Sequence, residues 1–401
     1  MFVIPKTMSA VVYRGPDDLR VETLPVPRIG PHELLVRVAV CGVCPTDIKK
    51  IKYGTVPPPR VFGHETAGTI VKLGARVRGF RLGDRVALHH HVPCLDCHYC
   101  RHRAFAQCEQ YKRTGITAGF EPAGGGYAEF VRVLPFVLPG VVKIPARNTF
   151  AEGAMLEPVN TVLKAVHRLN LLPGDTVLVA GQGPIGLMFT RLLQLAGARV
   201  LATDLLPNRL RLARQFGATW TCQVGRALRC APCDPVASRV ISSRAVSGIQ
   251  RFGAQRSARP TEPAAAPPPV PASPRRARSD APYLDAAVVC VPSDAAAHEA
   301  LARLRGGGQL LLFAHTKRGD TFTLDPAAVC VDEKDVLGSY SADFTLQKEV
   351  ARLVFSRQLD VRPLLTHEFP LAQTAAAVNL AAQPTPESLK VLVRVGTKAE
   401  E

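Results

Sequence analysis

The sequence lacks the features of membrane and secreted proteins. It has no apolar run close to the roughly 20 residues that a membrane-spanning helix needs. Its start, Met1 to Arg14, lacks the basic and apolar segments of a secretion signal, so we expect a cytoplasmic protein. With 47% hydrophobic and 21% charged residues, the 401-residue chain has a globular composition and is long enough for two domains.

Aromatic residues are few, at 6% of the chain, and no recognition-helix or base-stacking motif is present. The net charge of +17 by itself favours contact with nucleic acid. The charge is concentrated, however, because residues 221–282 contain ten arginines and only three acidic residues. A basic surface also suits anionic cofactors and substrates, so nucleic acid is not the expected partner.

Four of the eleven cysteines lie together in one short segment: Cys94, Cys97, Cys100 and Cys108. Thiolates this close can form a closed tetrahedral shell around zinc, which predicts a structural zinc site. Since the cysteines satisfy the metal, we expect the neighbouring histidines to lie on the surface: His89, His90, His91, His98 and His102.

A second group of ligand-type residues is dispersed along the chain. Cys41 lies in Cys-Gly-Val-Cys-Pro-Thr-Asp, His64 and Glu65 lie in Gly-His-Glu, and Glu157 lies in Leu-Glu-Pro. One thiolate, one imidazole and carboxylates can form a metal site with an open coordination position. Each motif alone is weak, because Gly-His-Glu is more often a turn than a metal site.

The chain changes its secondary-structure pattern near Asp175. Up to about Leu138, short β-branched runs and frequent turns predict an antiparallel, barrel-like domain. Beyond Asp175, strands alternate with helices, which predicts a parallel sheet covered by helices. The expected elements are strands 177–180, 199–203, 285–291 and 309–314, helices 184–195 and 294–305, and a turn at 306–308.

A glycine-rich turn joins the first of these strands to its helix. Gly181, Gly183 and Gly186 permit a tight turn and close approach of a pyrophosphate to the helix N-terminus. Asp204 ends the next strand, where a carboxylate can bind both ribose hydroxyls of NAD and repel the 2′-phosphate of NADP. Arg209 argues for NADP, because a guanidinium can pair with that phosphate. We expect NAD, with NADP as the alternative.

The order of these motifs, with Gly-Asp-Arg-Val at 83–86, resembles the zinc-containing medium-chain dehydrogenases over nearly the whole chain. The resemblance implies an α/β protein with a GroES-like antiparallel barrel and a Rossmann doubly wound parallel sheet. We expect the GroES-like catalytic domain at 1–165, the Rossmann domain at 166–340, and a segment at 341–401 that returns to the catalytic domain. Glu157 resembles the sorbitol and threonine dehydrogenase branch, which favours a polyol or another secondary alcohol as substrate.

The same resemblance implies the zinc ligands. It makes Cys41 and His64 ligands of a catalytic zinc. Glu65 and Glu157 either bind this zinc directly or hold a water molecule on it, and the choice between them stays open.

Further roles are implied around these ligands and in the Rossmann domain. Asp47 orients a ligand histidine, and Thr46 takes the substrate proton, although Thr46 is equally suited to cap a helix that starts at Pro45. Lys49 stands where many relatives carry a relay histidine. In the Rossmann domain, the resemblance places Pro184 and Ile185 in the cofactor loop, and Ile185 and Arg209 beside the adenosine.

These expectations add up to a zinc-dependent oxidoreductase that transfers a hydride from a secondary alcohol or polyol to NAD, assembled as a dimer or tetramer. The alternatives are a zinc-dependent, NADP-linked alcohol or aldehyde reductase, a zinc-free reductase of the same superfamily, and an inactive homologue with a nucleic-acid-binding insertion. The number of bound metal ions distinguishes the zinc-free reductase from the zinc-dependent enzymes. The salt dependence of nucleic-acid binding tests the alternative with a nucleic-acid-binding insertion.

Residues 226–282 interrupt the Rossmann pattern. They are rich in Pro, Ala and Arg and show almost no helical or strand period. Such a composition buries too little apolar surface to offset chain entropy, so we predict a disordered insertion. Cys230 and Cys233 lie within it, and we assign them no function.

We predict that trypsin cleaves first within residues 226–282, because the segment has many arginines and little apolar area to bury. Mass spectrometry of a limited digest identifies the first cuts. A variant that joins Gly225 to Tyr283 through a short linker should keep its zinc. Protection of this segment from trypsin, or unfolding of the deletion variant, would show that the segment is structured.

Overall fold

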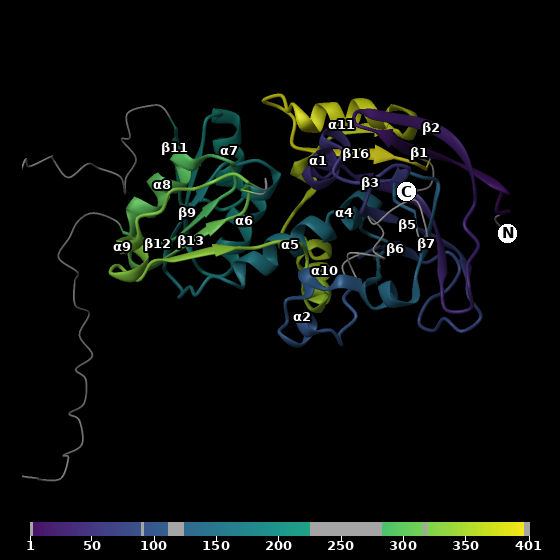
Figure 1. Ribbon diagram of the computed structural model, residues 1–401, viewed down its shortest axis with the longest axis horizontal. Coiled ribbons are helices and arrows are strands. Elements are labelled where there is room, and N and C mark those ends of the chain that lie inside the picture. Colours follow the sequence, from purple (N-terminus) through teal and green to yellow (C-terminus); the bar gives the residue numbers. More distant parts are fainter. Residues whose placement is uncertain (1–2, 90–91, 111–123, 225–282, 316–318, 397–401) are drawn as a thin grey trace, which may run out of the picture. The chain divides into compact units, whose positions relative to one another are not determined.

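Strands from both ends of the chain share one sheet, and the middle of the chain forms a second, parallel sheet (Figure 1). The computed structural model describes residues 3–89, 92–110, 124–224, 283–315 and 319–396. The predictions for residues 226–282, for His90 and His91, and for Cys230 and Cys233 lie outside the described residues.

The first and last parts of the chain build mainly antiparallel sheets. A three-stranded sheet has the order β2-β1-β4, and a seven-stranded sheet has the order β15-β16-β3-β5-β6-β8, with β7 paired to β3. Only the β15–β16 pair in these sheets is parallel. The strands are β1 (Thr7–Gly15), β2 (Asp18–Pro25), β3 (Leu34–Gly42), β4 (Arg60–Val61), β5 (Glu65–Leu73), β6 (Arg85–Ala87), β7 (Phe130–Val133), β8 (Val142–Lys143), β15 (Leu365–Pro370) and β16 (Lys390–Arg394).

Strand β3 is the centre of the larger sheet. Eight of its nine residues are buried, because neighbouring strands pair with it and helices and strands cover both of its faces. Strand β16, which lies almost 350 residues further along the chain, pairs antiparallel with its end, matching Leu392 to Gly42 and Val393 to Cys41. The C-terminal strand therefore reaches the segment that begins the candidate site.

The middle of the chain forms a six-stranded sheet with the order β11-β10-β9-β12-β13-β14, and every pair in it is parallel. Its strands are β9 (Thr176–Ala180), β10 (Arg199–Asp204), β11 (Trp220–Gln223), β12 (Leu284–Val289), β13 (Leu304–Leu312) and β14 (Asp335–Gly338). This is the doubly wound order of a dinucleotide-binding domain. The predicted fold class is confirmed, and the long segment between β11 and β12 has not removed a strand.

One predicted turn is wrong. The glycines at 306–308 lie inside β13, whose register against β12 shifts between Leu284 and Ala286. Gly307 has a φ of 67°, so the glycines form an irregularity within the strand, where residues without a side chain fit this backbone. The neighbouring helix α8 ends at Arg303 rather than at 305.

The helices that connect or cover the sheets are α1 (Pro45–Tyr53), α2 (His98–Arg101), α4 (Phe150–Ala154), α5 (Leu156–Val166), α6 (Pro184–Leu195), α7 (Pro207–Gln215), α8 (Asp294–Arg303), α9 (Pro326–Cys330), α10 (Gln347–Phe355) and α11 (Thr374–Ala382). None of the helices in the described part of the chain has the length and apolarity required to cross a membrane.

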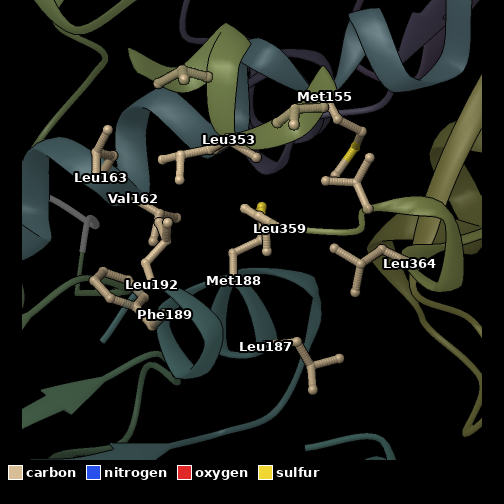
Figure 2. Close-up of a cluster of buried hydrophobic side chains, with 14 of the residues drawn as sticks. Met155, Val162, Leu163, Leu187, Met188, Phe189, Leu192, Leu353, Leu359 and Leu364 are labelled. Carbon is tan, nitrogen blue, oxygen red and sulfur yellow. The ribbon is translucent and has the colours of Figure 1, made fainter. Parts of the chain in front are cut away.

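The largest hydrophobic core packs α5, α6 and α10 together (Figure 2). Val162 of α5, Met188 and Leu192 of α6, and Leu353 of α10 lie in this core and are at most 5% exposed. Burying a side chain of this size stabilises a fold by roughly 1.5–3 kcal/mol. This core fixes α5, which carries Glu157 in its first turn.

Candidate active site

The candidate site begins where β3 ends and α1 starts. Cys44 is the N-cap of α1, its Sγ accepts a hydrogen bond of 3.4 Å from the backbone N–H of Thr46, and Pro45 occupies the first helical position. The alternative role of Thr46 as the helix cap is therefore wrong. Capping holds the Cys44 sulfur at the N-terminus of α1.

Cys44, His64 and Glu65 form a cluster, because their potential ligand atoms all lie within 4.8 Å of one another. His64 immediately precedes β5, Glu65 begins it, and Gly42 of β3 pairs with Glu65 in the sheet. A thiolate, an imidazole and a carboxylate are the donor types that bind zinc. The three residues supply three of the four ligands of a tetrahedral zinc.

Cys41, predicted as a ligand, is replaced by Cys44 in this cluster. Cys41 lies within β3, is completely buried, and packs among apolar side chains such as Val43 and Phe62. Its Sγ lies 3.4 Å from Thr66 Oγ1, and burial raises the pKa of its thiol to about 12. The two cysteines are three residues apart, and only the one beyond the strand end leaves the hydrophobic core.

Asp47 lies beside His64, and its role in orienting a ligand histidine stays a prediction. Asp47 Oδ2 lies 3.1 Å from His64 Nδ1, and both side chains are buried. Burial alone would lower the pKa of His64, but the Asp47 carboxylate and the Cys44 sulfur raise this pKa well above its usual value. An ionised partner on Nδ1 leaves the other ring nitrogen for a metal.

Glu157 lies beside the cluster but outside the set of three. It is 5% exposed and stands in the first turn of α5. Burial raises the pKa of Glu157 to about 7, and the Glu65 carboxylate acts in the same direction, whereas His64 and Lys390 act against it. A carboxyl group with this pKa can carry or release a proton near neutral pH.

Two further predicted residues lie on α1. Thr46 stands in the first turn and Lys49 in the next, and both are partly exposed. Their roles in proton transfer stay predictions.

Sequence reasoning missed Lys390 in this region. Its ammonium group lies against the Glu65 carboxylate and donates a hydrogen bond of 3.1 Å to the backbone carbonyl of Val43. The available signal was a lysine at the start of an apolar strand pattern, Lys-Val-Leu-Val-Arg.

The four-cysteine segment forms the second cluster. The sulfurs of Cys94, Cys97, Cys100 and Cys108 lie within 4.8 Å of one another. The N–H groups of Asp96 and Cys97 lower the pKa of Cys94 to about 6, whereas burial raises that of Cys100 to about 12. Four converging sulfurs in one turn-rich segment suit a closed zinc shell.

Three of the histidines that were predicted to lie on the surface are among the described residues, and two of the three are exposed. His98 and His102 are exposed and their rings lie 4.6 Å apart. His89 is completely buried, so its predicted surface position is wrong. It lies two residues after the end of β6 and packs so closely on Gly140 that a Cβ there would lie 2.9 Å from the His89 Cβ.

The glycine-rich turn has the geometry of a phosphate-binding loop. Gly181 has a φ of 91°, which strongly favours glycine, and a Cβ on Gly186 would overlap the Gly181 carbonyl. Gly183 is the N-cap of α6, and a Cβ there would meet no atom within 4 Å. Pro184 begins the helix, and Ile185 packs on the hydrophobic core. Among the described residues, no atom therefore crowds the Cβ position of Gly183 at the N-terminus of α6.

Asp204 and Arg209 differ in their surroundings. Asp204 ends β10, and its carboxylate accepts hydrogen bonds from the backbone N–H groups of Gln182 (2.6 Å) and Leu206 (2.9 Å). Arg209 is 7% exposed, and its guanidinium donates to the backbone carbonyls of Pro386 (3.2 Å) and Ser388. These contacts weigh against a phosphate-binding role for Arg209.

Together, a barrel-type sheet with two cysteine-containing clusters and a dinucleotide-binding sheet define a metal-dependent dehydrogenase. The model of the alcohol dehydrogenase GroES-like domain matches residues 30–146. The chain is 27% identical to sorbitol dehydrogenase of Bacillus subtilis (strain 168), covering 97% of this chain and 98% of the relative. It is 28% identical to sorbitol dehydrogenase of Homo sapiens, covering 93% and 92%.

The solved structure of alcohol dehydrogenase TADH from Thermus sp. ATN1 is similar in fold, with a TM-score of 0.74 and 25% identity. The match covers 97% of this chain and 100% of that structure. The GroES-like domain, the sorbitol dehydrogenase relatives and the similar dehydrogenase folds support the zinc-containing medium-chain alcohol and polyol dehydrogenase family. The resemblance inferred from the motifs is confirmed.

We predict about two zinc ions per chain, because the two clusters are separate and each has a zinc-type donor set. Cys44→Ser should lower the count to about one, whereas Cys41→Ser should leave it near two. Elemental analysis of purified, dialysed protein measures the number of zinc ions per chain in both variants. Loss of zinc from the Cys41 variant with retention in the Cys44 variant would restore Cys41 as the ligand.

Proposed function

We propose that the protein oxidises a secondary alcohol or polyol with NAD at a zinc site formed by Cys44, His64 and Glu65. The observation that carries this proposal is the cluster of these three donors beside the buried Glu157. The sorbitol dehydrogenase names of its relatives support the substrate class.

Bound zinc supplies a Lewis acid that lowers the pKa of a hydroxyl group, and bound nicotinamide supplies the hydride acceptor. The chain holds these groups through Cys44, His64 and Glu65 on one side and through the glycine-rich turn on the other. Asp47 fixes the ring of His64. Thr46 Oγ1 receives the substrate proton and gives up its own hydroxyl proton toward solvent, and Glu157 holds a proton near neutral pH.

The cofactor preference follows from charge at Asp204. Its carboxylate stands at the end of β10 beside the glycine-rich turn, where it favours a ribose diol over a 2′-phosphate. Arg209 is buried and its guanidinium donates to the backbone carbonyl of Ser388, so it presents no exposed positive charge to a 2′-phosphate. Both features support NAD.

A dehydrogenase screen tests the proposal. Purified, zinc-loaded protein is incubated with polyols, threonine and simple alcohols, and reduction of NAD or NADP is followed by absorbance. Turnover of polyols or secondary alcohols with NAD is expected. Absence of turnover with every alcohol in protein that carries two zinc ions would contradict it.

Glu157→Gln should lower turnover by at least about tenfold while zinc is retained, because Gln keeps the shape but cannot carry a proton. Glu152→Gln is the matched control. Glu152 is equally buried, but it caps α4 and binds Arg357, so its variant should lose thermal stability and keep turnover. Equal turnover of the Glu157 variant and wild type would exclude the proton-carrying role.

Asp204→Asn should raise the ratio of kcat/KM for NADP to that for NAD by on the order of tenfold. Asn removes the charge that repels a 2′-phosphate and keeps one carbonyl oxygen, which can accept from only one of the N–H groups of Gln182 and Leu206, because these bind different oxygens of Asp204. Steady-state kinetics with both cofactors measures the ratio. A wild-type enzyme that prefers NADP, or a variant with an unchanged ratio, would contradict the role of Asp204.

A further inference from the structure

Lys390 is a buried cation at the edge of the candidate metal site. It begins β16, is 6% exposed, and comes from a part of the sequence far from every other residue of the site. Lysine is almost never buried without a partner, because removing an ammonium group from water is costly. Its surroundings therefore need an explanation.

Two groups compensate the charge of Lys390. Its ammonium is ion-paired with Oε2 of Glu65, whose side chain is also buried, and it donates a 3.1 Å hydrogen bond to the carbonyl of Val43. Val43 lies between β3 and the cap residue Cys44. The same ammonium thus contacts one member of the metal cluster and the backbone that leads to another.

The fold makes room for this ion pair at Gly42. Gly42 pairs with Glu65 on one side and with Leu392 on the other. A Cβ on Gly42 would overlap Oε2 of Glu65 and would lie 3.0 Å from Cε of Lys390. The absence of a side chain at this position is what allows the lysine and the glutamate to meet.

The charges around the site show what the lysine balances. Asp47, Glu65 and Glu157 are buried carboxyl groups, and Cys44 adds a potential thiolate. One divalent ion compensates only part of this negative charge. Lys390 supplies a further positive charge whether or not a metal is bound.

We propose that Lys390 is a positioning residue that shares Glu65 with the metal: its ammonium holds one oxygen of the carboxylate and thereby weakens Glu65 as a metal ligand. This inference rests on the metal-dependent function proposed above. Lys390 keeps the apoprotein's buried carboxylates together and limits how tightly the metal is held.

Both effects of removing the lysine point in one direction. Without the ammonium, the buried Glu65 carboxylate loses its paired cation in the apoprotein, and a divalent ion no longer meets a nearby positive charge. Lys390→Met, which keeps the length and apolar bulk of the side chain, should therefore bind metal more tightly.

The test uses the full chain with its four-cysteine cluster kept filled. Zinc affinity of the second site is measured by competition with a chromophoric chelator, and Co²⁺ is used as a probe of the ligand geometry. Lys390→Met should bind zinc more tightly by on the order of tenfold and should change the visible spectrum of bound Co²⁺. The metal-induced rise in its melting temperature should be larger than in wild type.

Lys334→Met is the matched control. Lys334 is 9% exposed and likewise contacts a backbone carbonyl, that of Leu301 at 3.3 Å, and a carboxylate, that of Asp332 at 3.2 Å. It immediately precedes β14, a strand of the six-stranded parallel sheet. This variant should lose stability without a change in zinc affinity or Co²⁺ spectrum.

Two more variants keep the test decisive. Lys390→Gln can still donate a hydrogen bond to Val43, and it replaces the Met variant with the same expectations if that variant does not fold. In a Glu65→Gln background, replacing Lys390 should change zinc affinity much less, because the shared carboxylate is gone.

Wild-type affinity and an unchanged Co²⁺ spectrum in the folded Lys390 variants would overturn the inference. So would an affinity change of equal size in the Glu65→Gln background. Failure of the proposed function gives a different result: wild-type protein would bind metal only at the four-cysteine cluster, with a count near one and no second site to titrate.

Discussion

The burial of several charged side chains around His64 is the constraint on which the site depends. Asp47, His64, Glu65 and Glu157 are each at most 5% exposed, so each needs a compensating partner. Asp47 pairs with His64, and Glu65 pairs with Lys390. The cluster of Cys44, His64 and Glu65 has the donors that a divalent ion requires, and such an ion completes the compensation.

This constraint explains the topology around the site. The partners come from β3 and α1, from β5, from α5 and from β16, so no single segment could supply them. Pairing of β16 with β3 delivers Lys390, and packing of α5 on α6 and α10 delivers Glu157. The hydrophobic cores therefore serve to hold charges together that would otherwise repel or remain in water.

Much of the fold follows from local patterns, and the errors have local physical causes. The boundaries of α6 agree with the sequence because a glycine motif and Pro184 mark its start and Gly197 follows its end. The predicted turn at 306–308 is wrong because an irregularity within a strand uses glycines just as a turn does. The predicted surface position of His89 is wrong because only metal binding and exposure were considered for this histidine. Close packing on Gly140 buries it instead.

The candidate site shows the same limits. The short spacing of the four cysteines identifies their segment with little knowledge of the fold, whereas His64 and Glu65 are ligands only by the resemblance to the dehydrogenase family. The choice between Cys41 and Cys44 depends on where β3 ends, because a cysteine inside the strand points into the core and one at the helix cap does not. The place of Lys390 depends on the pairing of β16 with β3, which joins residues more than 300 positions apart, so the lysine that begins the apolar strand pattern does not by itself point to the site.

One short segment before β16 connects the cofactor site with the metal site. Arg209, which lies one turn into α7, donates to the carbonyls of Gln182, Pro386 and Ser388. Gln182 is part of the glycine-rich turn and donates its N–H to Asp204. Two residues after Ser388, Lys390 binds Glu65. A guanidinium that donates to these carbonyls holds the segment leading to Lys390 against α7, and this contact helps to keep the lysine beside Glu65.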